Sequence, residues 1–376
     1  MAPKRTRKPI AVVGIAGIAV FASYFAYFAY GQTATVPGPV VVSLPQIAPA
    51  DRQTTAIVAA ADGFLASLSD AQKADAMFEF GDAVQRVNWS NFPLGGPGAN
   101  RKGVKLGDMT DLQRAALTTL LNTVLSPEGA KMGLEQVAAD EMVATAAAAT
   151  AAAAGDTSRP PVSFGSAYYF VSFVGVPSTT AAWMLQFGGH HLAINATVVG
   201  SNVTLSPSLT GGQPLKLSYN GEQVYIVEKE AVQAAAMLAN FTDDQRKIAI
   251  VSTGLGDLVL GPGQDGKTLQ PEGLPRNAMN DAQKIQFLGL IQARLGMLNA
   301  DDLTDKMAAA QKNLDQTTFG WWGPQTPIGA AYFRITGPTL VLEFSPQTND
   351  GDPADHAHNM YRDPTNEYGA AWVSLK

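Results

Sequence analysis

The four histidines of the chain fall in two pairs, and this grouping is the strongest sign of chemistry in the sequence. His190 and His191 are adjacent, and a single residue separates His356 from His358. Imidazole is the commonest protein ligand for transition metals and titrates near neutral pH. Alternate residues of an extended strand share a face, so His356 and His358 can reach one ion together, and one of the adjacent pair can join them.

The neighbours of the first pair indicate which of its members faces a polar site. If the segment is extended, His190 shares a face with Leu192, and His191 shares the other face with Asn195. We therefore expect His191 to reach the ion and His190 to pack or hydrogen-bond beside it. A bulge at Gly188-Gly189 would let both histidines take part.

Several other side chains are candidates for the same site. Glu343 lies in an otherwise apolar segment, where a carboxylate needs a partner. Arg334 is the obvious partner, and a structural ion pair would explain both residues. In the catalytic interpretation Glu343 is a ligand or general base, and Arg334 and Arg362 orient an anionic substrate. Four further residues are predicted to bind the ligand, although the two tryptophans would equally form a buried aromatic corner: Asn195, Asp363, Trp321 and Trp322.

The absence of cysteine narrows the chemistry. With no cysteine in the chain, a thiolate zinc site, a cysteine nucleophile and a disulfide framework are all excluded. Three histidines with one open position are typical of catalytic zinc, and clustered histidines also suit copper. We predict a Zn or Cu site serving a hydrolase, an oxidoreductase or a metal-handling protein. The alternatives are a metal-free binding module for an anionic or sugar-like ligand and a structural envelope protein.

Charge argues against nucleic acid as a partner. The formal net charge is −6, and residues 1–31 contain four basic and no acidic residues, so the remainder is more acidic than the whole. Such a surface lacks the basic footprint that phosphate backbones require. A small-molecule or anionic ligand is the expected partner.

The N-terminus has the pattern of an export signal. Four basic residues precede an apolar run over residues 10–30, which fits either a cleaved signal peptide or an uncleaved anchor that spans the membrane once. A proline-rich linker follows over residues 32–50. We therefore expect residues 51–376 to be exported to the periplasm or the extracellular space, with membrane contact through the N-terminal segment alone.

Four helix starts share one sequence pattern. An apolar residue, a capping Ser, Thr or Asn, an Asp and a Gln recur at residues 68–73, 109–114, 241–246 and 279–284. Each matches a capping box, in which the cap and the Gln satisfy the first free N–H groups of a helix. Two copies in each half of the chain suggest an internal duplication.

The elements that must position the histidines alternate in blocks. Helical spacing predicts helices over 51–154, where an alanine tract extends the last helix to residue 154, and over 229–318. β-Branched and aromatic runs predict strands over 165–227, including one at 182–199, and over 330–360. This order predicts a single α+β domain whose mostly antiparallel sheet is flanked by two helical blocks.

The sequence resembles one known family over roughly residues 60–376. The similarity is clearest around the histidines, and its segments are Phe187-Gly188-Gly189-His190-His191-Leu192, Phe319-Gly320-Trp321-Trp322-Gly323, His356-Ala357-His358, Tyr361-Arg362-Asp363-Pro364 and Asn366-Glu367-Tyr368-Gly369. They resemble the histidine-containing segments of domain-of-unknown-function family 3500 (DUF 3500). Arg101-Lys102-Gly103-Val104 also fits the family. The resemblance implies a shared site and supplies no reaction.

Overall fold

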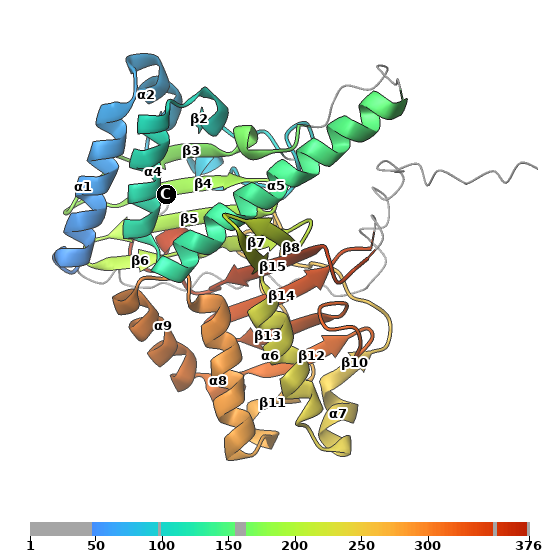
Figure 1. Cartoon of the computed structure of the whole chain (residues 1–376). Coiled ribbons are helices and arrows are strands. Elements are labelled where there is room, and N and C mark those ends of the chain that lie inside the picture. The colour runs from blue at the N-terminus through green and yellow to red at the C-terminus, as the bar shows by residue number, and fades with distance from the viewer. Residues whose placement is uncertain (1–46, 97–98, 155–162, 349–351, 374–376) are drawn as a thin grey trace, which may run out of the picture.

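The fold is built on one large sheet that is shared by both halves of the chain. The computed structural model describes residues 47–96, 99–154, 163–348 and 352–373 (Figure 1). Along the sheet the strands are β1 (Met77–Phe78), β3 (Phe170–Val174), β4 (Trp183–Gly189), β5 (Leu192–Val199), β7 (Ser208–Gly212), β15 (Ala357–Arg362), β14 (Leu340–Pro346), β13 (Tyr332–Gly337), β12 (Thr318–Trp322) and β10 (Ile250–Ser252).

Short strands extend this sheet, and most neighbours are antiparallel. β2 (Val104–Lys105) pairs with β3, β11 (Leu274–Pro275) pairs with β12, and β6 (Asn202–Thr204) pairs with β5. Among the strands of the described residues, only the β1–β3 and β10–β12 pairs are parallel. A separate hairpin is formed by β8 (Lys216–Tyr219) and β9 (Glu222–Tyr225).

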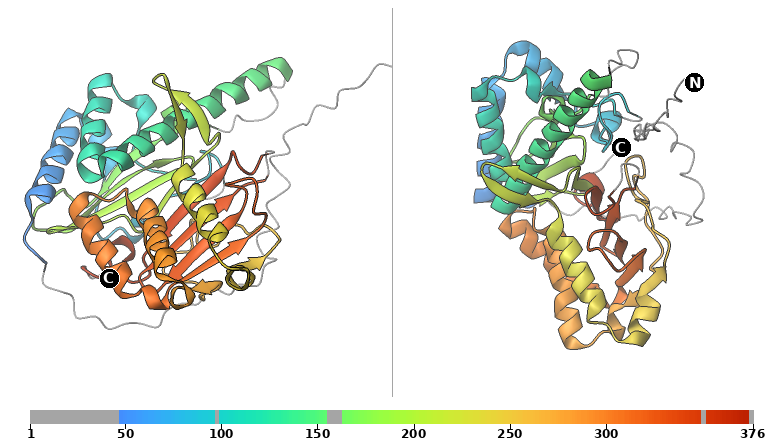
Figure 2. Two further views of the ribbon diagram at one scale, coloured as in Figure 1. Left: turned by 60° about the horizontal axis from the view of Figure 1, so that its bottom comes forward. Right: turned by 45° about the vertical axis from the view of Figure 1, so that its right-hand side comes forward.

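The long helices lie on one face of the sheet, as the views in Figures 1 and 2 agree. α1 (Arg52–Ser67), α2 (Asp70–Ala76), α4 (Asp111–Val124) and α5 (Pro127–Ala154) cover the first half, and α6 (Glu228–Ala239), α7 (Asp243–Ala249), α8 (Asp281–Leu295) and α9 (Ala300–Lys312) cover the second. The short α3 (Ala83–Arg86) lies between β1 and β2 in the chain. Each half has its own large apolar cluster between helices and sheet.

All four predicted capping boxes are present. In α2, α4, α7 and α8 the cap side chain accepts the backbone N–H of the Gln, and the Gln side chain accepts the N–H of the cap. The four Gln side chains also bond in pairs: Gln72 with Gln113 and Gln245 with Gln283. The shared sequence pattern therefore fixes both the start of each helix and its contact with a neighbour.

The two halves repeat one arrangement of elements. In the first, α1, α2, β1, β2 and α4 precede the antiparallel strands β3, β4 and β5, and in the second α6, α7, β10, β11 and α8 precede β12, β13 and β14. The pairings repeat as well, since β3 and β12 each take one parallel and one antiparallel short partner. β7 and β15 meet antiparallel at the centre of the sheet and join the halves.

The predicted α+β class and the mostly antiparallel sheet are confirmed, and α5 runs through the alanine tract to Ala154. Three details differ. The strand predicted at 182–199 is a hairpin of β4 and β5, β12 begins at Thr318 within the block predicted to be helical, and short strands interrupt both helical blocks.

The export signal and most of the linker predicted over residues 1–50 fall outside the described residues. Among residues 47–96, 99–154, 163–348 and 352–373, no helix is long and apolar enough to cross a membrane.

Candidate metal centre

The first pair of histidines forms the tip of the β4–β5 hairpin. Gly189 pairs with Leu192, which leaves His190 and His191 as a two-residue turn. His191 has a φ of 57°, in the left-handed region that few non-glycine residues adopt. The prediction that the two side chains alternate across a strand was therefore wrong, because the tight turn and not strand parity sets their directions.

A glycine before the turn lets an aromatic ring support it. A Cβ atom at Gly189 would lie 2.7 Å from ring carbons of Tyr169, which is too close for a non-bonded contact. The hydroxyl of Tyr169 donates a hydrogen bond to the backbone carbonyl of His190. Without a side chain at position 189, the buried Tyr169 can pack directly beneath the turn.

The second pair of histidines lies at the start of β15. His358 belongs to this strand and pairs with Gly211 of β7, and His356 immediately precedes it. A Cβ atom at Gly211 would lie 2.2 Å from the carbonyl oxygen of Ala357. Glycine at this position therefore allows β7 and the histidine-bearing strand to approach closely.

Three histidines converge into one buried group. One ring nitrogen each of His191, His356 and His358 lies within 4.8 Å of the others, and no further His, Asp or Glu of the described chain joins this set. The side chains are 2%, 6% and 8% exposed. The Nε2 atoms of His191 and His356 are 2.8 Å apart. The sheet thus brings together the turn at 190–191 and the strand start at 356–358, which are more than 160 residues apart in the sequence.

Burial keeps two of the three histidines in the form that binds metals. Burial lowers the pKa of His191 well below its ordinary value, and the neighbouring histidines and Arg101 lower it further. Burial and then the charges of His356 and His190 lower the pKa of His358 in the same way. Both imidazoles are therefore neutral at neutral pH, with a lone pair free for an ion.

His190 makes a different contact. Its Nδ1 lies 2.6 Å from Oδ1 of Asp140 on α5, and its ring is tilted by 33° against that of His191, with centroids 3.7 Å apart. Burial lowers the pKa of His190, while the hydrogen bond and charge of Asp140 oppose this effect. The other oxygen of Asp140 accepts the backbone N–H of Gly165. Asp140 therefore fixes the orientation of the His190 ring beside the triad.

The donor set fits a transition-metal ion. Two nitrogens bound at about 2.05 Å to one tetrahedral ion are about 3.3 Å apart, so a small widening of the 2.8 Å separation between His191 and His356 would admit the ion. Nδ1 of His191 is buried and has no hydrogen-bond partner among the described residues. Three imidazole ligands leave the fourth position of a tetrahedral site open, which is the arrangement of catalytic zinc.

The residues predicted to be catalytic lie in other networks. Glu343 accepts the N–H groups of Val259 and Leu260, each at 2.8 Å, and the hydroxyl of Tyr332 at 2.7 Å. Arg334 lies opposite Glu343 on the neighbouring strand. Burial would lower the pKa of Arg334, but the charge of Glu343 helps to raise it. The ion pair of Arg334, however, is with Glu272, so both residues fasten the segment 259–272 to the sheet. The histidine group does not include Glu343.

Arg362 is also held within the protein. Although it shares β15 with His358, its guanidinium donates to the carbonyls of Leu260 and Gly261 and pairs with Glu367 and Asp265. Desolvation alone would lower the pKa of Arg362, but its acidic partners raise it. The two arginines are therefore engaged by protein groups and not presented to the histidines.

The four predicted binding residues have protein partners as well. Asn195 donates to the carbonyl of Pro207 and accepts from Gln186, and Asp363 forms an ion pair with Lys306. Trp321 is buried in the core of the second half, and Trp322 lies under the guanidinium of Arg334. Trp321 therefore fits the buried aromatic corner, whereas Trp322 is only half-buried.

Asp140, Asn91 and Arg101 were missed as neighbours of the centre. Asp140 had a weak signal, as an acid one helical turn after Gln136 in a segment rich in alanine and valine. Arg101 lies in a segment that resembles the family, and nothing in the sequence places it near a histidine. Asn91 gave no signal, because only the folded loop brings it to His358.

An α+β protein with a buried three-histidine group of this kind falls in the class of candidate metal proteins. The model of the family described as "Protein of unknown function (DUF3500)" matches residues 50–370, so the chain belongs to this family. Comparison with curated proteins and with solved structures gave no match.

Proposed function

We propose that the protein is a metal-dependent hydrolase that holds one Zn²⁺ ion through His191, His356 and His358. The observation that carries the proposal is the convergence of these three buried imidazoles into one ligand group. Zinc held by three protein ligands lowers the pKa of a bound water to about 7, which supplies a nucleophile at neutral pH.

The neighbouring residues support this role. Asp140 bonds Nδ1 of His190, which leaves the other ring nitrogen of His190 to exchange a proton beside the triad. The positive charges of Arg101 and a bound Zn²⁺ would together exceed the single negative charge of Asp140. An anionic substrate would offset this positive charge, so an ester or amide that carries a carboxylate or phosphate is the proposed class.

The proposed location rests on the sequence pattern of the N-terminus. The basic and apolar pattern of residues 1–30 supports export, with the body outside the cytoplasm and attached at most by this segment. In such a compartment the absence of cysteine removes any competing thiolate ligand from the chain itself.

The test combines metal content with turnover in the purified full-length chain. After loading with Zn²⁺ and removal of free ion, we expect one ion per chain by elemental analysis, and we expect hydrolysis of p-nitrophenyl esters and phosphodiesters that depends on the ion. The His356→Ala/His358→Ala variant should lose both. The matched control is Glu343→Gln. It removes the acid that the sequence suggested as a ligand or general base but that does not belong to the three-histidine group, so this variant should retain the ion.

A second candidate function is metal handling, which the near-complete burial of the triad favours. It predicts stoichiometric Cu or Zn with no ion-dependent turnover on any of these substrates. If no ion binds under any loading condition, both metal functions are wrong.

A further inference from the structure

We propose that Asn91 is a positioning residue of the metal centre and joins the two segments that carry its ligands. This inference rests on the proposed metal site and adds to it a residue from a third segment, between α3 and β2. Asn91 is 4% exposed and contacts a histidine from each segment.

One contact is made by the backbone and the other by the side chain. The carbonyl of Asn91 accepts the backbone N–H of His191 at 3.5 Å, at the tip of the β4–β5 hairpin. The side-chain Nδ2 lies 3.2 Å from Nε2 and 3.5 Å from Nδ1 of His358 on β15. Asn91 therefore lies between the turn and the strand and touches a ligand on each.

The side-chain amide is free to serve the ring in either protonation pattern. Oδ1 of Asn91 is buried and has no hydrogen-bond partner in the part of the chain that the structure describes. If a nitrogen of the His358 ring carries no hydrogen, it can accept a hydrogen bond from Nδ2 of Asn91. If one ring nitrogen binds the ion, the other carries a hydrogen and needs an acceptor such as Oδ1. Rotating the amide by 180° would present Oδ1 to that N–H without breaking any other bond of Oδ1.

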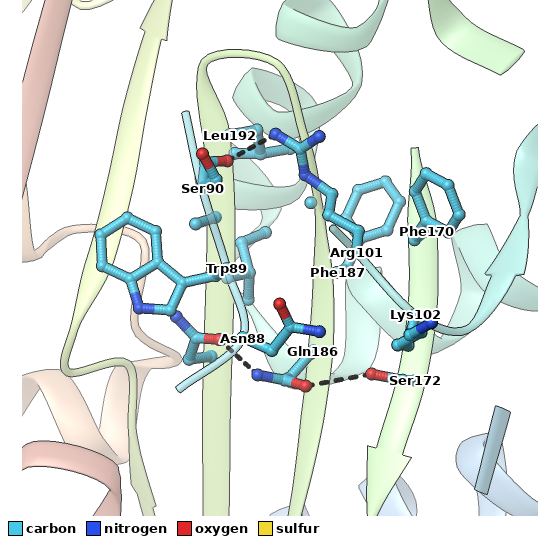
Figure 3. A pocket seen from close by; sticks show the side chains of 14 residues that line it. Asn88, Trp89, Ser90, Arg101, Lys102, Phe170, Ser172, Gln186, Phe187 and Leu192 are labelled. Atoms are coloured by element: carbon cyan, nitrogen blue, oxygen red, sulfur yellow. Dashed lines mark hydrogen bonds between the residues drawn. The ribbon is translucent and has the colours of Figure 1, made fainter. Parts of the chain in front are cut away.

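A buried arginine holds the loop in place. One terminal nitrogen of Arg101, Nη2, donates to the carbonyls of Ser90 at 2.6 Å, Phe92 at 2.5 Å and Gly189 at 2.7 Å. Figure 3 shows the guanidinium beside Ser90 and Leu192, at the tip of the hairpin. The arginine thus ties both neighbours of Asn91 to the residue that precedes His190.

These contacts have the form of an outer coordination shell. A histidine ligand usually bonds a protein group through its second nitrogen, which fixes the ring, and loss of such a partner typically weakens metal affinity by about 10–100-fold. Since Nδ2 of Asn91 lies within 3.5 Å of both ring nitrogens of His358, Asn91 would be the partner of whichever nitrogen does not bind the ion, and Arg101 fixes the position of Asn91.

The test compares two asparagines of one loop. Asn88 lies three residues earlier and bonds Gln85 and Asn100, away from the histidines. We expect Asn91→Leu to weaken Zn²⁺ binding by about 10–100-fold and to shift the visible spectrum of the Co²⁺-loaded chain. Asn88→Leu should leave both unchanged. Asn91→Asp, which keeps an oxygen beside His358, should bind within a few-fold of the original chain.

The outcomes separate this proposal from the metal site itself. If Asn91→Leu folds and binds Zn²⁺ within twofold with an unchanged Co²⁺ spectrum, the positioning role is wrong while the metal site stands. If the original chain binds no ion, the metal site is wrong and this inference falls with it. Should Asn91→Leu fail to fold, Asn91→Ala is judged by the same affinity and spectral criteria.

Discussion

The two hairpins at equivalent places in the two halves have the same frame and different tips. β4–β5 is closed by the pair Gly189–Leu192 around His190-His191, and β13–β14 is closed by Gly337–Leu340 around Pro338-Thr339. Both are two-residue turns that follow a glycine. The fold therefore builds the same turn twice and places potential metal ligands at only one of them.

The two hairpins also differ in the residue pair that lies three positions from the closing pair of each turn. Gln186 pairs with Asn195 in the first half, where the amides bond one another, and Arg334 pairs with Glu343 at the same distance from the turn in the second. In the second half, Arg334 forms an ion pair with Glu272, and Glu343 accepts the backbone N–H groups of Val259 and Leu260. These contacts fasten residues 259–272 to the sheet. The β4–β5 hairpin thus carries the histidines of the candidate metal site, whereas the β13–β14 hairpin holds residues 259–272 against the sheet.

The largest change in Zn²⁺ affinity should come from replacing the histidine ligand at the tip of the β4–β5 hairpin. Asparagine tolerates the left-handed conformation of His191, so His191→Asn keeps the turn and removes one ligand. We expect Zn²⁺ affinity to fall by at least about 100-fold, since a three-ligand site becomes a two-ligand site. Competition against a chromophoric chelator measures this change.

The matched control is Thr339→Asn, at the equivalent turn position of the other hairpin. It should leave Zn²⁺ affinity unchanged. Equal losses in the two variants would contradict the assignment of the metal site to one tip alone.

Alanine at the two turn glycines should separate stability from binding. A Cβ at Gly189 meets the Tyr169 ring at 2.7 Å, and a Cβ at Gly337 meets Oγ1 of Thr317 at 2.5 Å. Each substitution should lower the free energy of unfolding by about 1–3 kcal/mol, as overpacking usually does.

Only Gly189→Ala should also weaken Zn²⁺ binding, because it displaces the ring of Tyr169 beneath His190. Urea unfolding and metal titration of both variants test this, and retained affinity in Gly189→Ala would count against the support role of Tyr169.

Acid should destabilise the metal-free protein through the triad. The pKa of His191 is lowered in the folded state, so the unfolded state binds its proton first as the pH falls below about 6.5. Stability is therefore full above this pH and declines below it. Between pH 7 and pH 5.5, in the presence of a chelator, the original chain should lose about 1 kcal/mol more than His191→Asn.

A half-buried acid of the second half, Asp302, changes stability with pH in the opposite direction. Burial raises the pKa of Asp302 to about 6, so its contribution to stability is lost as the pH rises from about 3.9 through 6. Comparing His191→Asn with the original chain cancels this term, because both contain Asp302. Identical pH profiles for the two chains would contradict the lowered pKa of His191.

The smallest expected difference lies between the paired capping glutamines. Gln113 bonds Gln72 and the carbonyl of Ser67, and Gln283 bonds Gln245 and the carbonyl of Asn240. Replacing either by leucine removes hydrogen bonds to exposed or half-buried partners and should cost about 0.5–1.5 kcal/mol. We expect the two costs to agree within about 0.5 kcal/mol in urea unfolding. A larger gap would show that the halves share a pattern without sharing its energetics.

Local rules predicted the frame well and the site in part. Capping chemistry located four helix starts because cap and glutamine lie three residues apart in the sequence. The histidine pairs pointed to one centre because their grouping is itself a sequence feature. The turn at His190-His191 was missed, since Gly189 and Leu192 pair across a tip that lacks the usual turn residues. Asn91 and Asp140 reach the centre only through tertiary contacts, which no short-range pattern records.

The most direct measurement is anomalous diffraction from crystals of the protein grown with Zn²⁺. We predict one strong peak about 2.0–2.1 Å from a ring nitrogen of each of His191, His356 and His358. A peak bound elsewhere, or no peak among these three rings at saturating Zn²⁺, would contradict the proposed centre.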